Sequence, residues 1–260
     1  MSGIVVFMYH ALYRTDAEYQ ALDPADRPYA VRLQAFEEQL DRLQESGVPI
    51  LEPEVFEAKT PKRRGVVLTF DDGHGSNYVY AFPALAARGL RALFFVTTDF
   101  IGRRRGFCDW AGLRTMADAG MVLGSHGCSH RFLDDLTDDE VRGEFEGSRA
   151  VIARETGARV TAISFPGGRF RTRQLALARS AGYRMCFSSR IGVWRGASPG
   201  SRPVPRIPVR ADTPIDLYAR YAVADVGLLI RAHTGDGLKR LVRRIIGNRL
   251  YHALYEKLSV

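Results

Sequence analysis

The 260-residue sequence lacks the features that would place it within a membrane or in an oxidising compartment. No apolar run reaches the roughly 18 residues that a transmembrane helix needs. The N-terminus, MSGIVVFMYHAL, has no basic segment before its apolar run, so it does not read as a signal peptide. The three cysteines, Cys108, Cys128 and Cys186, are odd in number and have no CxxC spacing, which predicts reduced thiols. We therefore expect a cytoplasmic protein, with peripheral membrane association as the alternative.

The sequence also lacks the signatures of nucleic-acid binding, although its formal net charge is +8 and its pI is about 9.6. Much of the net positive charge lies in short clusters at 61–64, 102–106 and 238–249. There is no RNA-binding aromatic signature and no recognition-helix pattern, so we predict no nucleic-acid partner. Positive charge of this kind favours anionic surfaces without identifying one.

Apolar runs typical of buried strands alternate with segments of helical periodicity along most of the chain. This alternation predicts an α/β fold with a parallel sheet and helical crossovers. About seven strands fit a distorted (β/α)7-type barrel better than an open sheet. Strands are expected at 4–9, 65–70, 90–98, 121–125, 160–165, 183–189 and the end of 196–209, and helices at 32–47, 79–89, 111–120, 138–157 and 173–182.

The C-terminal segment 238–260 has apolar residues at helical spacing with arginines and lysines between them. We expect residues 1–237 to form one barrel domain and residues 238–260 to form an amphipathic helix packed on it. The alternative for this helix is binding to an anionic membrane surface.

Polar residues follow several of the predicted strands at the point where each strand ends. In parallel α/β folds the carboxyl ends of the strands meet at one edge, where functional residues gather. We therefore expect these residues to share one rim. They are His10, Asp71-Asp72, His126 with His130, and Pro166-Gly167-Gly168.

Asp71 and Asp72 stand side by side at the end of a buried strand, where two negative charges repel each other. A divalent cation would stabilise one carboxylate as a ligand and leave the other free to act as a base. The segment SHGCSH (125–130) offers two histidines, and its glycine and serine residues predict a loop instead of the HExxH helix. Two imidazoles and one carboxylate form a common catalytic zinc set, although other divalent ions also fit. The sequence thus predicts a divalent metal site, with Zn²⁺ preferred.

Three motifs in this order, TFDDG (69–73), SHGCSH (125–130) and SFPGG (164–168), resemble those of the polysaccharide deacetylases of the NodB-homology type, carbohydrate esterase family 4. The resemblance covers roughly residues 1–210. It implies a distorted barrel of about seven strands and a metal-dependent hydrolase. Such an enzyme would remove N-acetyl groups from amino sugars of a polysaccharide, an oligosaccharide or a glycolipid precursor.

The resemblance also implies roles for the aspartates and histidines of the first two motifs. Asp71 would be the catalytic base, while Asp72, His126 and His130 would bind the metal. The opening MYH resembles a deacetylase subgroup with a circularly permuted motif order, in which the strand carrying the acid histidine comes first. On that reading, His10 is the general acid.

The third motif departs from the family pattern in two positions. Ser164 stands where the family has an arginine that orients the base, and Gly167 stands where it has a tyrosine. Arg206 is our first candidate for the missing arginine, and Arg169 is the second. Pro166, Gly167 and Gly168 remain the predicted substrate-binding loop.

Other residues near the motifs have both a functional and a structural interpretation. His74 could contact substrate, although a solvated loop histidine is the favoured interpretation. Trp110 could form part of a sugar-stacking wall or pack in the core, and the same holds for Trp194. Cys128 lies between the two histidines but is expected to point away from them.

Two further functions fit the same motifs. The chain could be a deformylase or cyclic-amide hydrolase on the same scaffold. It could also be an inactive barrel that keeps the metal and binds glycan without turnover. Product analysis separates the first alternative from a deacetylase, and the absence of turnover would favour the second.

Overall fold

The computed structural model describes residues 3–57, 64–196, 202–225 and 227–228. Its centre is a parallel seven-stranded sheet with the strand order β8-β7-β6-β5-β4-β1-β9. The predicted α/β fold with a distorted (β/α)7-type barrel is confirmed as a curled parallel sheet, and every described strand of this sheet overlaps a predicted one. The strands are β1 (Ile4–Tyr9), β4 (Gly65–Phe70), β5 (Leu93–Val96), β6 (Val122–Ser125), β7 (Ala162–Ser164), β8 (Met185–Phe187) and β9 (Ile207–Pro208).

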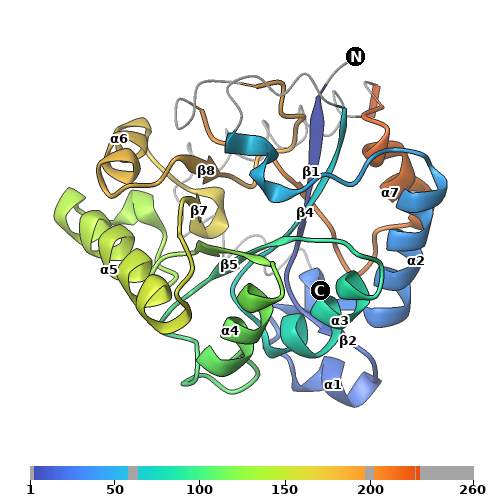
Figure 1. Cartoon of the computed structure of the whole chain (residues 1–260), viewed down its shortest axis with the longest axis horizontal. Helices are drawn as coiled ribbons and strands as arrows, with labels where there is room; N and C mark the ends of the chain where they lie inside the picture. Colours follow the sequence, from blue (N-terminus) through green and yellow to red (C-terminus); the bar gives the residue numbers. More distant parts are fainter. Residues whose placement is uncertain (1–2, 58–63, 197–201, 226, 229–260) are drawn as a thin grey trace.

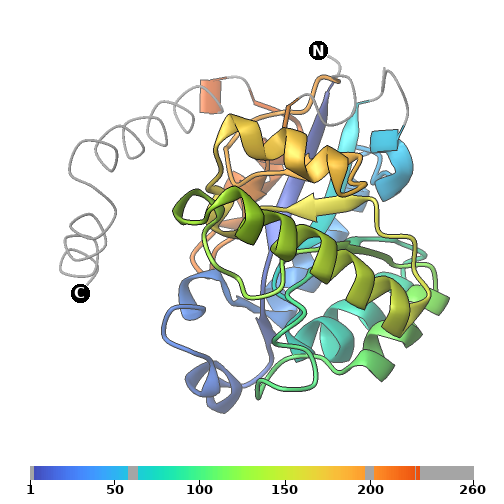
Figure 2. The ribbon, with the colours of Figure 1, turned by 90° about the vertical axis from the view of Figure 1, so that its left-hand side faces the viewer.

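Helices surround the sheet on its outer face. Figure 1 shows α5 and α6 on one side of the molecule and α2 and α7 on the opposite side, and Figure 2 shows α5 and α6 running side by side. Helix α5 begins as predicted at Thr137, whose hydroxyl accepts a hydrogen bond from the Glu140 N–H. The helices are α1 (Asp16–Ala21), α2 (Leu33–Glu45), α3 (Phe82–Ala86), α4 (Trp110–Asp118), α5 (Asp138–Thr156), α6 (Thr172–Ser180) and α7 (Ile215–Ala222).

The segment 204–208 contacts both edges of the curled sheet. At its start, the Val204 N–H donates to the Cys186 carbonyl of β8 at 2.7 Å, and the Ser188 N–H donates to the Val204 carbonyl at 3.0 Å. At its end, β9 pairs with β1. The two edges β8 and β1 are therefore brought round toward each other, as the predicted barrel requires.

Alternation along the strands divides the core into two layers. In β4, Val66, Leu68 and Phe70 belong to the large cluster between sheet and helices, whereas Val67 belongs to a smaller cluster inside the curl. The same alternation turns Thr69 and Asp71 toward the interior. Asp71, the first aspartate of the motif, therefore continues the row of inward-facing side chains of β4.

The segment between β1 and α2 lies over the carboxyl ends of β1 and β4. It contains α1 and the two-stranded sheet of β2 (Leu12–Tyr13) and β3 (Val31–Arg32). Its Leu12 N–H donates to the Ser76 hydroxyl at 2.8 Å. Figure 1 places α1 and β2 beside α3, so this segment lies over the loop that follows the TFDDG motif.

Three expectations concern the C-terminal segment, membrane-spanning helices and the cysteines. The predicted helix at 238–260 lies outside the described residues, so its packing and its membrane binding stay predictions. Among the helices that the structure describes, none combines the length and the apolar character needed to cross a bilayer. Cys108, Cys128 and Cys186 are free thiols, as predicted.

Candidate metal centre

Asp71 and Asp72 are both buried, and an unusual backbone turn separates their directions. Asp71 is 2% exposed and Asp72 is 6% exposed. Asp72 has φ 73°, a left-handed conformation that residues other than glycine rarely adopt. His130 shares this feature with φ 61°. Strained backbone of this kind gathers at functional sites, where the surrounding structure holds it in place.

Arg206 lies against Asp71 in a two-point ion pair. Its Nη1 is 2.7 Å from Asp71 Oδ1, and its Nη2 is 2.7 Å from Asp71 Oδ2. Arg206 is fully buried, with 0% exposure. This fork-to-carboxylate geometry is the strongest common form of a charged hydrogen bond. Arg206, the first candidate, is therefore the arginine that pairs with Asp71, and its role in orienting a base stays a prediction.

Every donor hydrogen of Arg206 has an acceptor. Besides Asp71, its guanidinium donates to the Ser188 carbonyl at 3.2 Å, to the Thr69 hydroxyl at 3.2 Å and to the Ser164 hydroxyl at 2.7 Å. Five donors with five acceptors allow the charge to be buried without an unsatisfied group. Burial alone would raise the pKa of Asp71, but Arg206 and His126 lower it below its ordinary value.

Asp72, His126 and His130 bring three ligand atoms within 4.8 Å of one another. The Nε2 atoms of His126 and His130 lie 3.3 and 3.2 Å from Asp72 Oδ1. That oxygen is buried and accepts no hydrogen bond. A buried carboxylate oxygen between two imidazoles is the arrangement that a divalent cation would satisfy.

The orientation of His126 also suits a metal ligand. Its Nδ1 lies 2.8 Å from the Ser164 carbonyl oxygen, which can only accept a hydrogen bond. The proton of a neutral imidazole therefore sits on Nδ1, and Nε2 presents its lone pair toward Asp72. Outer hydrogen bonds of this kind fix the tautomer of metal-bound histidines. The residues present thus fit a divalent metal.

Charge interactions shift the pKa values of the three groups in different directions. Burial would raise the pKa of Asp72, but His130, His10 and His126 hold it well below its ordinary value. Burial lowers the pKa of His126 despite the nearby Asp71 and Asp72. For His130, burial is outweighed by the interaction with Asp72, and its pKa is raised.

His10 lies one residue beyond β1, beside the two aspartates in the barrel rim. Its ring centre is 4.9 Å from that of Tyr29, and its buried Nδ1 has no hydrogen-bond partner. The Asn77 side-chain amide donates to the His10 carbonyl at 2.8 Å and holds the backbone there. Burial would raise the pKa of Asp71 and of Asp72, and His10 is one of the neighbouring groups that lower both.

Glu144, on α5, holds the loop that carries the two histidines. Its Oε2 accepts hydrogen bonds from the Cys128 N–H at 2.6 Å and from the Ser129 N–H at 3.0 Å, and its Oε1 accepts one from the Ser129 hydroxyl. The Cys128 sulfur lies 3.6 Å from the Glu144 carbonyl oxygen, against α5 and away from the ligands, as predicted. Glu144 is a residue that the sequence did not reveal, because nothing in the spacing of 125–130 points to a partner on a distant helix.

Replacing Glu144 with alanine should weaken metal binding and lower stability. It would remove the acceptors of two loop N–H groups, at a cost of about 1–3 kcal/mol in the free energy of unfolding. Loss of an outer-shell partner should weaken metal affinity by about 10–100-fold. Urea denaturation and competition with a chelator measure the two effects. Glu146→Ala on the exposed face of the same helix is the control, and equal behaviour of the two variants would contradict the assignment.

Contacts within the barrel explain both departures of the third motif. Ser164 donates its hydroxyl hydrogen to Asp71 Oδ2 at 3.2 Å and accepts a hydrogen bond from Arg206, so the arginine reaches Asp71 from the segment just before β9. At Gly167, φ is 60° and an added Cβ would lie 2.7 Å from the Phe132 ring. Phe132 therefore occupies the space beside this position.

Arg169 and Trp194 both lie away from the candidate metal centre. Arg169, the second candidate, pairs with Asp134 and Asp135 at 2.8 Å and does not reach Asp71. Trp194 packs against Phe56 at the amino ends of the strands, bridged to Ile4, which supports its core interpretation.

His74 and Trp110 have different environments from each other. His74 is 2% exposed, so the favoured interpretation as a solvated loop histidine is wrong, and burial lowers its pKa to about 4. The Phe107 ring covers it at 4.5 Å. Trp110 begins α4 and packs, partly buried, against the outer core. Their substrate contacts stay predictions.

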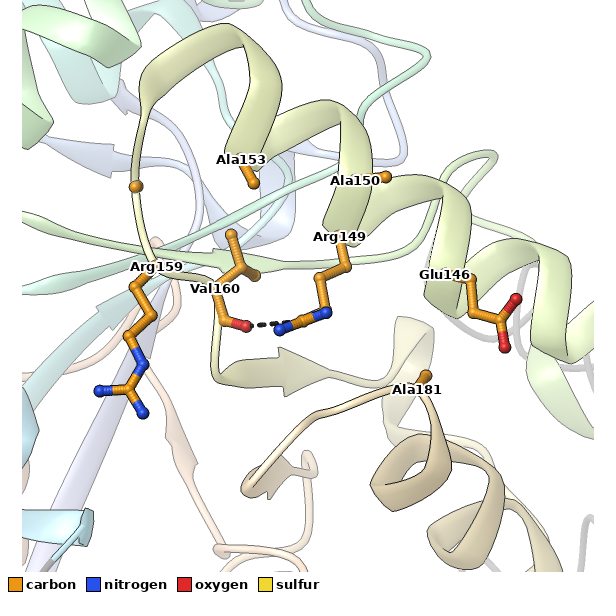
Figure 3. Close-up of a pocket in the computed structure, with 8 residues that line it drawn as sticks. Glu146, Arg149, Ala150, Ala153, Arg159, Val160 and Ala181 are labelled. Atoms are coloured by element: carbon orange, nitrogen blue, oxygen red, sulfur yellow. Dashed lines mark hydrogen bonds between the residues drawn. The ribbon is translucent and has the colours of Figure 1, made fainter.

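Two surface grooves lie apart from this centre. One, of about 200 Å³, runs along α5, where Arg149 donates to the Val160 carbonyl at 3.0 Å (Figure 3). The other, of about 400 Å³, lies between β9 and α7. Neither is lined by Asp71, Asp72 or the ligand histidines, so the barrel rim itself is the candidate site.

Comparisons with known proteins agree with this geometry. The family model of polysaccharide deacetylases matches residues 58–186. The chain is 29% identical over 162 residues to the protein YxkH of Bacillus subtilis (strain 168), covering 60% of this chain and 58% of that protein. It is 28% identical over 131 residues to a 30.6 kDa protein of Geobacillus stearothermophilus. The matched regions span about half the length of these curated relatives.

Solved structures share the fold over most of the chain. The structure of IcaB from Ammonifex degensii is 26% identical, with a TM-score of 0.72, and covers 86% of this chain and 98% of that one. The deacetylase PplD of Streptococcus pyogenes, solved in complex with acetate, is 23% identical, with a TM-score of 0.73, and covers 85% and 98%. The chain therefore contains a polysaccharide deacetylase domain of the NodB-homology type, over the residues 58–186 that the family model matches.

Proposed function

We propose that this protein is a metal-dependent hydrolase that removes N-acetyl groups from amino sugars of a polysaccharide, an oligosaccharide or a glycolipid precursor. One observation carries the proposal. A buried carboxylate held by an arginine, Asp71 with Arg206, lies directly beside a metal-ligand group of Asp72, His126 and His130. The polysaccharide deacetylase domain over residues 58–186 supports hydrolysis of an acetylated glycan.

A divalent metal bound to Asp72, His126 and His130, preferably Zn²⁺, would polarise the acetamide carbonyl and make a bound water more acidic. Asp71, as general base, takes a proton from the attacking water. Two hydrogen bonds from Arg206 keep the Asp71 carboxylate ionised and fix its orientation. His10, in the same rim, gives a proton to the departing amine. The loop Pro166–Gly168, at the carboxyl end of β7, borders the sugar that carries the acetamide.

The direct test is product release from acetylated sugars. The metal-loaded protein is incubated with N-acetylglucosamine oligomers and with matched N-formyl compounds, and acetate and formate are measured separately. Acetate release is the expected result. Formate alone would identify a deformylase instead. Retained glycan binding with no release of either product would identify an inactive binding barrel.

His10→Ala should retain bound metal and lose most of the deacetylation rate. General acid catalysis typically contributes about 10²–10⁴-fold, and His10 is outside the ligand group. Metal content by mass spectrometry and kcat from acetate release measure the two properties. Tyr29→Phe, which keeps the ring beside His10, is the control with unchanged values. Loss of metal, or full activity, in His10→Ala would assign His10 another role.

A further inference from the structure

Asp72 also belongs to a second group of potential ligands. Its Oδ1 faces His126 and His130, while its Oδ2 lies 3.8 Å from His74 Nε2. Asp26 Oδ2 lies 3.8 Å from the same nitrogen. The ligand atoms of Asp26, Asp72 and His74 all lie within 4.8 Å of one another. None of the steps proposed for deacetylation uses Asp26 or His74.

The His74 side chain is buried, but its Nε2 atom has no hydrogen-bond partner. It is 2% exposed, and its ring is stacked on Phe107 at 4.5 Å. Its Nε2 is buried and makes no hydrogen bond, since both neighbouring carboxylate oxygens are 3.8 Å away. Buried polar atoms in native proteins nearly always have a partner. Separations of 3.8 Å are too long for a hydrogen bond, whereas two ligands of a tetrahedral ion lie about 3.4 Å apart, so a small inward shift of these side chains would seat an ion.

Asp26 would be the third ligand, and it is the member of this group that solvent reaches. Its side chain is 25% exposed, in contrast to the 3% of His74. The backbone around it is ordered by hydrogen bonds, because the Asp26 N–H donates to Asp23 and the Tyr29 N–H donates to Asp26. A cation could therefore reach this group from the side of the segment between β1 and α2.

We propose that Asp26, Asp72 and His74 form a second divalent-cation site, which shares the Asp72 carboxylate with the first. The set of one imidazole and two carboxylates suits Zn²⁺ or Mn²⁺. Bridged metal pairs in enzymes typically lie about 3.5–4 Å apart. This site goes beyond the proposed deacetylation, which needs only the first ion.

The second ion should bind more weakly than the first. The first ion is held by two imidazoles and by the Asp72 carboxylate, whose negative charge it partly neutralises. The second ion shares that carboxylate and is also repelled by the positive charge of the first ion. We expect its dissociation constant to be at least ~10-fold larger. Occupancy of the second site therefore depends on the metal concentration.

Metal titration of the full chain tests the proposal. The protein is stripped with a chelator and titrated with Zn²⁺ alone, by calorimetry and by equilibrium dialysis with mass spectrometry. The wild type should bind two ions in two steps. His74→Ala and Asp26→Asn should each bind one, with the tighter step unchanged. Asp26→Asn changes a partly exposed side chain and so keeps the test valid if His74→Ala misfolds.

Two controls separate this site from the first one and from general charge effects. Asp23→Asn removes a nearby carboxylate that pairs with Arg104, and His10→Ala removes a nearby histidine, so both should still bind two ions. His126→Ala/His130→Ala should lose the tighter step. A wild type that binds one ion at saturating Zn²⁺ would overturn the second site while leaving the deacetylase proposal intact. Two steps that survive in both His74→Ala and Asp26→Asn would overturn it equally.

Discussion

His126→Ala/His130→Ala should abolish tight metal binding and reduce deacetylation to background. The two imidazoles supply two of the three ligand atoms of the first site, and Asp72 Oδ1 alone cannot hold the tightly bound ion there. Wild-type protein purified without chelator should carry about one tightly held divalent ion per chain. Mass spectrometry after gel filtration, which removes weakly held ions, measures this content.

Cys128→Ala is the matched control for the double variant. Cys128 lies between the two histidines in sequence, but its sulfur faces α5 at 3.6 Å from the Glu144 carbonyl. It should therefore keep both metal and activity. Metal loss in Cys128→Ala would make the sulfur a ligand. Equal and negligible metal in wild type and double variant, even after added Zn²⁺, would remove the proposed mechanism.

Arg206→Met should destabilise the fold more than any other single arginine substitution within the described part of the chain. The change leaves the Asp71 carboxylate, 2% exposed, as an unpaired buried charge. Breaking a buried ion pair in this way costs about 3–5 kcal/mol in the free energy of unfolding. Deacetylation should fall as well, because Asp71 would lose its orientation and its low pKa. Urea denaturation and acetate release measure the two effects.

Two further variants separate charge burial from loss of packing. Arg206→Met/Asp71→Asn removes the unpaired charge and should recover part of the lost stability, without recovering activity. Arg169→Met is the burial-matched control. Arg169 is 3% exposed, but its partners Asp134 and Asp135 lie near the surface, so their freed carboxylates reach water and the loss is smaller. A double variant no more stable than Arg206→Met would show that packing, not the charge, sets the cost.

The strands and helices could be predicted because their signals are local. The apolar runs at 4–9 and 65–70 became β1 and β4 with the same bounds. The long helix at 138–157 followed from its periodicity and from Thr137, which caps α5 as predicted. The metal-ligand candidates followed from the same reasoning, because each one stands at or just beyond a strand end and parallel strands bring those ends to one rim.

Residues that act through long-range contacts could not be predicted in this way. His74 stands next to the motif, yet its burial depends on the ring of Phe107, which lies 33 residues later in the chain. Glu144 reaches the histidine loop from α5, and no local pattern indicates such a contact. Arg169 and Arg206 both follow the third motif, and their sequence neighbours do not distinguish which of them meets Asp71.

The sequence alone determined the α/β alternation, the family motifs and the pairing of two aspartates with two histidines, because each depends on residue type and spacing within a short stretch. Only the tertiary structure decided that Arg206, beside β9, is the partner of Asp71. The physical reason is that curling brings the segment 204–208 against β1, so a side chain from the end of the fold enters the barrel interior. There it meets a carboxylate that could not stay buried without a cation.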